Sequence, residues 1–222
     1  MVVALTVFAL CSAALVGGCR AQDSAPSEPS TSALPPFPYP PFKIQTSVAV
    51  PLEQPLLGAA EFALDMSVDA RLSDDPDEER LYREYRSKIA PEADSDAPRT
   101  SDPYVGQTGG ALHRAVAAQQ LPDGAAEVTI CLFDTPGLYV MKEDGELTAA
   151  PSTGPIGLWR PRVQWTNRPA ADGSTSREPR WLLLDIGAIQ NMTKEQIAEV
   201  CDPFKPQPFV QKAPDPTSAP TG

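Results

Sequence analysis

Proline is spread very unevenly along this chain, and it limits where a fold can form. Seven prolines fall between residues 20 and 43, and a second group follows residue 202. Proline fixes its own φ and has no amide hydrogen to donate, so such segments favour extended polyproline II over helix or sheet. We therefore expect one folded domain over 44–205, long enough for one sizeable core, after a Pro/Ser-rich tether (19–43) and before a disordered Pro-rich tail (206–222).

The start of the chain has the plan of an export signal. Residues 2–16 are almost entirely apolar, too short a run to span a bilayer stably, and small residues follow them. The residues Val16-Gly17-Gly18-Cys19 resemble the lipobox of bacterial lipoprotein signal peptides. This resemblance implies removal of residues 1–18 and lipid on Cys19, which would anchor the protein on the extracytoplasmic face of the cell membrane. The alternative is a secretory signal without lipid, in which Cys19 is incidental.

The charge of the chain excludes one class of partner. The net charge is −11, and residues 1–18 contribute none of it. Such an acidic protein does not bind nucleic acid or an anionic membrane surface non-specifically. Arginine outnumbers lysine 12 to 6, and Ala, Pro and Asp are plentiful, a usage that resembles that of actinobacteria.

Two of the four cysteines remain in the predicted domain. Cys11 lies in the signal and Cys19 is the lipidation residue, which leaves Cys131 and Cys201. In an oxidising compartment an even pair favours a disulfide bond, and the alternative is two buried free thiols. A bridge would close a loop of about 70 residues and constrain the unfolded chain by roughly 4 kcal/mol.

The apolar patterning predicts an α+β domain, with an antiparallel meander sheet and two or three helices. Strands are predicted at 46–52, 61–72, 127–134, 137–142, 146–149, 157–167 and 180–187. Helices are predicted from Asp75 to Pro91, over 108–120, and from a capping box at Thr193 and Gln196 to Cys201. The acidic run 74–79 fits the first turn of a helix better than a calcium loop.

The stretch EVTICLFDTPG (127–137) ends in a pattern that resembles the Asp-x-x-Gly switch of GTPases. A GTPase also needs a phosphate loop with a Gly-Lys pair, and the sequence contains no Gly-Lys pair. We therefore expect no nucleotide here. The stretch instead predicts a hairpin whose turn is Pro136-Gly137, stabilised by hydrogen bonds from Asp134 and Thr135.

Catalytic residue patterns are scarce. The single histidine, His113, falls beside the apolar stripe of a predicted helix, and no nucleophile elbow accompanies it. Asp65 and Asp69 would lie on one face of a predicted strand, about 13 Å apart, too far for a glycosidase pair without a partner from elsewhere. No cluster has metal-ligand spacing, so we expect neither a metal nor a cofactor and assign no catalytic residue.

The stretch GLWRPRVQWTNR (157–168) carries the main candidate binding site. On an extended chain Trp159 and Trp165 point one way, while Arg160 and Arg162 point the other, and Trp181 could join the aromatic side. Tryptophan faces stack on sugar rings, and guanidinium groups hold anions, so these four residues form a possible anion or glycan site. The alternative is that the tryptophans belong to the core and the arginines are solvated.

These observations favour a membrane-anchored envelope lipoprotein with a binding or structural role. Its partners would be the membrane, through the lipid on Cys19, and an unknown envelope component: a protein, a lipid or a glycan. One alternative is an envelope hydrolase or transferase that acts on cell-wall carbohydrate through carboxylates. Another is a carrier of small hydrophobic ligands.

Overall fold

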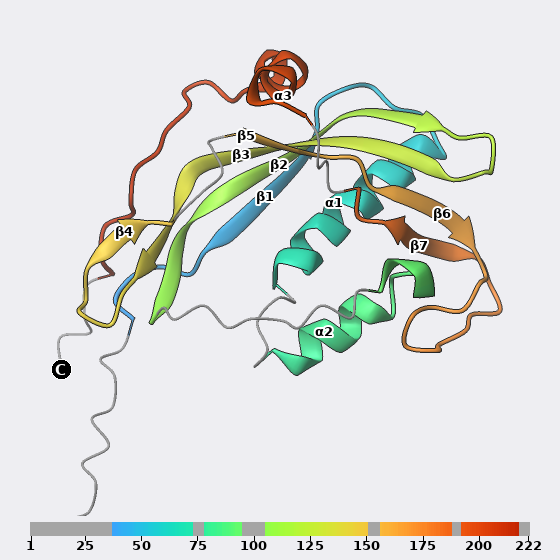
Figure 1. The fold of residues 1–222 in the computed structure, drawn as a ribbon, viewed down its shortest axis with the longest axis horizontal. Coiled ribbons are helices and arrows are strands. Elements are labelled where there is room, and N and C mark those ends of the chain that lie inside the picture. Colours follow the sequence, from blue (N-terminus) through green and yellow to red (C-terminus); the bar gives the residue numbers. More distant parts are fainter. Residues whose placement is uncertain (1–36, 73–77, 95–104, 151–155, 188–191, 218–222) are drawn as a thin grey trace, which may run out of the picture. The chain divides into compact units, whose positions relative to one another are not determined.

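The computed structural model describes residues 37–72, 78–94, 105–150, 156–187 and 192–217, which all belong to the unit Pro35–Gly222. A long helix lies on one face of a sheet and a short helix on the other (Figure 1). The strands are β1 (Lys43–Val48), β2 (Gly106–Gln120), β3 (Ala126–Met141), β4 (Leu147–Ala149), β5 (Ile156–Trp159), β6 (Arg162–Thr166) and β7 (Arg180–Asp185). The helices are α1 (Leu56–Leu72), α2 (Glu79–Arg86) and α3 (Lys194–Cys201), with short 3₁₀ turns at Pro91–Ala93 and Asp202–Phe204.

The seven strands form one mixed sheet, so the domain is α+β as predicted. The main order is β1-β2-β3-β6-β7, and β4 and β5 also pair with β3. All pairings are antiparallel except that of β1 with β2, which is parallel. The sheet is therefore not a pure antiparallel meander. The long strand β3 holds it together, because it pairs with β2 along one side and with β4, β5 and β6 along the other.

Residues 61–72 belong to the helix α1, and the predicted strand there is wrong. The residues that α1 buries recur at helical spacing: Ala59, Ala60, Ala63, Leu64, Met66, Ser67 and Ala70. Several of these also fit a period of two, which produced the strand prediction. The helix is favoured because alanine has the highest helix propensity and because small side chains let the helix lie close to the sheet.

Residues 106–120 form the strand β2, and the helix predicted over 108–120 is also wrong. The register with β3 shifts between Gly110 and Leu112 and again between Ala115 and Ala117. Each shift interrupts the two-residue alternation of a strand. The sheet is also covered on both faces, so neighbouring residues such as Ala115 and Val116 are both buried. Together these effects produce an apolar spacing that imitates a helix.

The predicted hairpin turn at Pro136-Gly137 is a kink within β3. The strand β2 pairs with β3 on both sides of it, Leu112 with Phe133 and Gly110 with Gly137. Gly137 has a φ of 107°, a conformation that favours glycine. The side chain of Asp134 accepts a hydrogen bond from the amide of Leu138 at 2.9 Å, so the predicted role of this aspartate holds although the turn does not.

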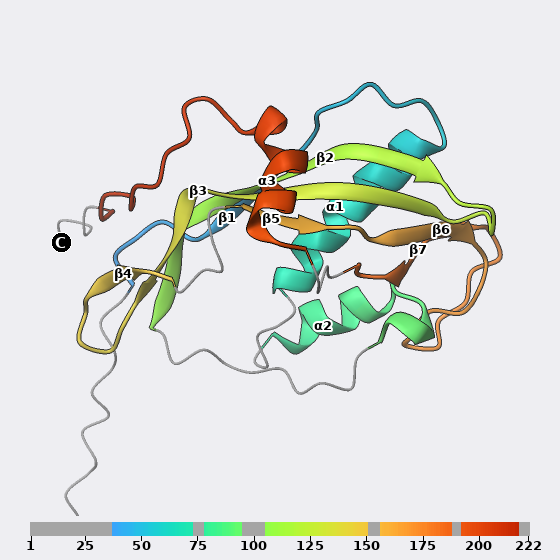
Figure 2. The ribbon, with the colours of Figure 1, turned by 45° about the horizontal axis from the view of Figure 1, so that its top comes forward.

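Two cores lie on opposite faces of the sheet. Figure 2 shows the helices α1 and α3 that lie on these two sides. On the side that we call the α1 face, α1 covers Val128, Ile130 and Val163. On the side that we call the α3 face, α3 covers Leu112, Val116, Phe133 and Leu158. Successive residues of β3 therefore face alternate helices.

The last helix confirms its predicted start. Thr193 and Gln196 form the capping box, and α3 ends at Cys201. By contrast α2 runs only from Glu79 to Arg86, and its predicted start at Asp75 lies outside the described residues.

The described parts of both Pro-rich segments contact the domain. The hydroxyl of Thr108 donates to the carbonyl of Pro40 at 2.5 Å. Residues 206–217 contain no helix or strand, but the amide of Lys212 donates to the carbonyl of Pro136 at 2.9 Å and that of Thr217 to Pro38 at 2.7 Å. The predicted signal peptide, Cys19 and most of the tether lie outside the described residues.

Candidate functional site

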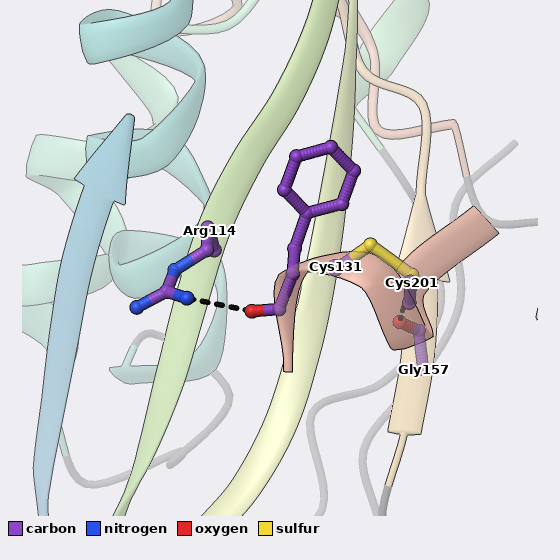
Figure 3. The surroundings of a disulfide bond; sticks show 5 residues. Arg114, Cys131, Gly157 and Cys201 are labelled. Atoms are coloured by element: carbon purple, nitrogen blue, oxygen red, sulfur yellow. Dashed lines mark hydrogen bonds between the residues drawn. A yellow bond between two sulfur atoms is a disulfide. The ribbon is translucent and has the colours of Figure 1, made fainter. Parts of the chain in front are cut away.

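The disulfide predicted between Cys131 and Cys201 fastens α3 to the sheet (Figure 3). The two sulfur atoms are 2.01 Å apart, and both residues are fully buried. The sulfur of Cys201 also lies 3.9 Å from the carbonyl oxygen of Gly157. A disulfide sulfur has no proton to donate, so this is a packing contact. Beside it, Arg114 of β2 donates to the carbonyl of Phe204 at 2.6 Å and holds the chain that follows α3.

The only histidine of the chain lies buried between β2 and α1. His113 is 6% exposed, and its Nδ1 lies 2.8 Å from the hydroxyl of Ser67, which is 2% exposed. That hydroxyl also lies 2.6 Å from the carbonyl oxygen of Leu64, which can only accept. A hydroxyl has one proton, so we assign it to the bond with Leu64, and Nδ1–H of His113 donates to Ser67.

This polarity is the opposite of the one that catalysis requires. A catalytic serine donates its proton to a basic imidazole nitrogen, which then removes it. Here the serine proton is directed to a backbone carbonyl, and burial lowers the pKa of His113 to about 4. The imidazole is therefore neutral near pH 7, and the ring of Trp159 lies 6.2 Å from it. The pair joins α1 to the sheet and has the properties of a structural contact.

Two carboxylates are closer together than the sequence predicts. Because residues 56–72 form a helix, Asp65 and Asp69 are one turn apart, with about 5–6 Å between Cβ atoms where the predicted strand gave 13 Å. Lys88 forms an ion pair with Asp69 at 2.6 Å. Partial burial raises the pKa of Asp65, as does the charge of Asp69, while Lys88 lowers it. Asp65 itself is still accessible to solvent.

Arg160 and Arg162, the predicted arginines, lie on the α3 face, in a part of the sheet that α3 does not cover. A depression of about 340 Å³ lies there, and its lining includes Gln119, Glu127, Thr129 and Arg160. Val128 and Ile130 of β3 point to the α1 face. Thr129, which lies between them, therefore points to the α3 face, and so the depression is on that face. The depression carries both signs of charge, because Glu127 and Arg160 both line it. Gln119 donates to Glu127 at 3.0 Å, and Arg160 is exposed beside them.

Arg162 has a defined partner. Its guanidinium forms an ion pair with Asp123 at 2.6 Å. Its Nε atom is buried and has no hydrogen-bond partner among the described protein atoms. Because Arg162 is already paired, Arg160 is the arginine of the predicted site that is more available to a ligand.

The predicted tryptophans lie on the α1 face. Trp159 packs against the core beside His113. Trp165 on β6 stands opposite Trp181 on β7, and their ring centroids are 5.4 Å apart in an edge-to-face arrangement. Trp181 in turn stacks on Phe62 of α1 at 6.4 Å. Trp159 is half-buried, whereas Trp165 is 56% exposed.

The four residues of the predicted anion or glycan site therefore do not form one pocket. Arg160 and Arg162 lie on the α3 face, and Trp165 lies on the other. The sequence did not reveal Phe62 or Ser67 as neighbours of these aromatic and imidazole rings, because both fall in the segment predicted as a strand. Their helical spacing from the small residues of α1 is the signal that could have revealed them.

Three further observations concern membrane helices, metal sites and similarity to known proteins. None of the helices in the described residues is long and apolar enough to cross a membrane. Within the same ranges, no three His, Cys, Asp or Glu side chains are grouped so that they could hold a metal ion. Comparison with known proteins gives no match, neither to a protein-family model, nor to a curated protein, nor to a solved structure.

Proposed function

We propose that this protein is a lipid-anchored lipoprotein of the cell envelope that acts by binding a partner. The binding role is inferred above all from the state of His113. The single imidazole of the chain is buried, neutral and committed to Ser67, so it is not available as a general acid or base. The disulfide between Cys131 and Cys201 supports an oxidising location and removes both thiols as nucleophiles.

The anchor is inferred from the lipobox-like residues that end at Cys19. Two or three acyl chains, at about 0.8 kcal/mol per buried methylene, would hold the protein durably where one chain would not. Position 19 lies eighteen residues before residue 37, where the described domain begins. At about 3.1 Å per residue, an extended polyproline II tether of this length would reach up to about 55 Å from the membrane.

Fractionation of cells tests the anchor. We expect the wild-type protein to fractionate with membranes and to resist a salt or carbonate wash. The variant Cys19→Ala should leave the membrane fraction. The matched control is Cys11→Ala, which changes a cysteine of the predicted signal and should leave the fractionation unchanged. If Cys19→Ala stays with the membrane after the wash, the lipoprotein proposal is wrong.

Crosslinking in intact cells tests the binding role. We expect crosslinked products that contain this protein and a defined envelope component. The variant Arg160→Glu, which reverses the charge beside the depression on the α3 face, should lose products whose partner binds there. If the protein crosslinks only to itself at all crosslinker lengths, it has no close envelope partner of the kind proposed.

A second candidate function is carbohydrate hydrolysis by Asp65 and Asp69, and one observation favours it. The two carboxylates are one helical turn apart, and their environments differ, since the pKa of Asp65 is raised and Asp69 is paired with Lys88. Glycosidases of the retaining type use two carboxyl groups about 5–5.5 Å apart with divergent pKa values. Cell-wall hydrolysis that is lost in Asp65→Asn but kept in Glu61→Gln would favour this candidate over a binding role.

A further inference from the structure

The described part of the chain exposes three large hydrophobic side chains, and they lie apart. Trp165 is 56% exposed, Leu72 42% and Val210 41%. Leu72 ends α1, whereas the indole of Trp181, which contacts Trp165, lies beside Gly58 at the start of that helix. Fourteen residues of helix separate these positions by about 20 Å. Val210 bonds to Thr135 at the kink of β3. Trp165 therefore belongs to an apolar surface of its own.

The ring of Trp165 is held in place by a neighbouring aromatic side chain. Trp181 meets Trp165 edge to face, with an interplanar angle of 65°, and stacks on Phe62 at 25°. Gly58 of α1 lies beside Trp181 and close to the side chain of Gln54. A Cβ atom there would lie 3.4 Å from Nε1 of Trp181 and 3.0 Å from the side-chain oxygen of Gln54. A ring fixed by such neighbours loses little freedom when a ligand covers it, so its apolar area is available for affinity.

The size of this surface favours one kind of occupant. A stable protein–protein interface buries about 800 Å² on each partner, and a single indole face supplies a small fraction of that area. A pyranose ring matches it, because the axial C–H groups of one sugar face cover about one aromatic ring. The hydroxyl edges of a sugar need polar partners. Asn167 follows two residues after Trp165, and Arg168 is held by Glu92 at 2.8 Å.

We propose that Trp165, supported by Trp181 and Phe62, is the stacking surface for one ring of a β-linked, gluco-configured sugar chain. In such a sugar all ring substituents are equatorial, which leaves a flat C–H face. The inference rests on the proposed binding role and names the partner class at this site. It does not depend on the lipid anchor, whose failure the fractionation of Cys19→Ala would reveal separately.

The test uses the full mature protein purified from the cell envelope, in detergent where it carries an anchor. The probes are the β-1,4-linked tetrasaccharides of N-acetylglucosamine and of glucose, with an α-1,6-linked mannose tetrasaccharide as the comparison sugar. Tryptophan fluorescence measures binding, and acrylamide quenching measures the access to Trp165. We expect saturable binding of at least one gluco-configured probe, with reduced quenching and at least tenfold weaker binding of the mannose probe.

The variants separate stacking from folding. Trp165→Ala should weaken the binding at least tenfold, Trp165→Tyr should restore most of it, and Leu72→Ala should leave it unchanged. Circular dichroism should be the same for all three. The inference is overturned if no gluco-configured probe binds, if Trp165→Ala binds as well as the wild type, or if the mannose probe alone binds. A blue shift of the emission on plain phosphatidylcholine vesicles, without a response to sugar, would assign the ring to a lipid surface and also overturn it.

Discussion

On the α1 face a helix of 17 residues buries seven side chains, whereas on the α3 face a helix of eight residues buries only Cys201. Helices shorter than about 12–15 residues are marginal alone in water, so a short helix depends on its attachments. The long helix is held by packing spread over five turns and by the contact between Ser67 and His113. The short helix is held by one covalent bond and by the residues around it. The first attachment is distributed and the second is local.

The difference extends to the rest of each face. On the α3 face, the part of the sheet beyond α3 carries polar side chains such as Gln119, Glu127 and Arg160 around an open depression. On the α1 face, most side chains are covered by α1, and Trp165 is a large hydrophobic side chain that is left exposed. Packing therefore dominates the α1 face except at Trp165, whereas a whole part of the α3 face is open to solvent.

Removal of the disulfide should have the largest effect on this comparison. The double variant Cys131→Ala/Cys201→Ala releases a loop with a sequence separation of 70 residues. In the chain-entropy model, this lowers the free energy of unfolding by about 4 kcal/mol. Urea unfolding measures the loss. Hydrogen exchange should show that the amides of α3 lose protection while those of α1 keep theirs.

The control for this variant is Cys19→Ala, which should leave the free energy of unfolding unchanged. Peptide mapping without reduction should recover Cys131 joined to Cys201 in the wild type. A loss below about 1 kcal/mol, or equal loss of protection in both helices, would mean that the two faces are not held by different means.

One part of the pH dependence of stability should report His113, on the α1 face. Burial lowers the pKa of His113 from 6.5 to about 4, so the unfolded chain binds a proton in this range before the folded protein does. The contribution of His113 to the free energy of unfolding is therefore fully present above pH 6.5 and falls as the pH drops towards 4. The slope reaches about 1.4 kcal/mol per pH unit, and the total is about 3 kcal/mol.

Asp65 acts in the opposite direction, because its pKa is raised and its contribution to stability increases as the pH falls. The comparison of the wild type with His113→Gln removes this effect, since Asp65 is present in both. Urea unfolding at pH 6.5 and at pH 5 should give a smaller difference for the variant. Equal differences for the two proteins would show that His113 is charged in the folded state or is not buried.

The variant Ser67→Ala should cost about 1–3 kcal/mol, because it leaves Nδ1–H of His113 buried without an acceptor. Ser87→Ala is the matched control. The hydroxyl of Ser87 bonds to the carbonyl three residues earlier, as that of Ser67 does, but Ser87 is on the surface and has no histidine partner. Thermal unfolding should show a change within about 0.5 kcal/mol for the control. Equal losses would assign the effect to the local helix bond and not to the contact between helix and sheet.

Much of the fold follows from local signals in the sequence. The capping box at Thr193 identifies α3 because its two hydrogen bonds are local. The pairing of Cys131 with Cys201 follows because these are the two cysteines left in the domain. The strands β4 and β7 are found near their predicted positions because short alternating runs separated by turn residues are a local pattern. The single strand predicted over 157–167 is wrong in one respect, because it is divided at Arg160 and Pro161 into β5 and β6.

The errors have a common physical cause, which is tertiary context. In β2 the two register shifts move apolar residues off the period of two, and in α1 the small residues fit either period. The kink in β3 imitates a turn, because Pro136 and Gly137 suit both. The contact of Ser67 with His113, 46 residues apart, cannot be read from spacing once the two elements are exchanged. For the same reason the sequence could pair Trp165 with Trp181 but could not place Phe62 against Trp181.

The smallest effect is expected on the open part of the α3 face. Arg160 is exposed beside the depression and has no ion pair among the described residues, so Arg160→Gln should change the free energy of unfolding by less than about 0.5 kcal/mol. Thermal unfolding checks this, and Ala63→Leu is the contrasting variant, because added volume against the covered face should cost about 1–3 kcal/mol. If Arg160→Gln were as costly as Ala63→Leu, the depression would be part of the packed structure and not a surface left free for a ligand.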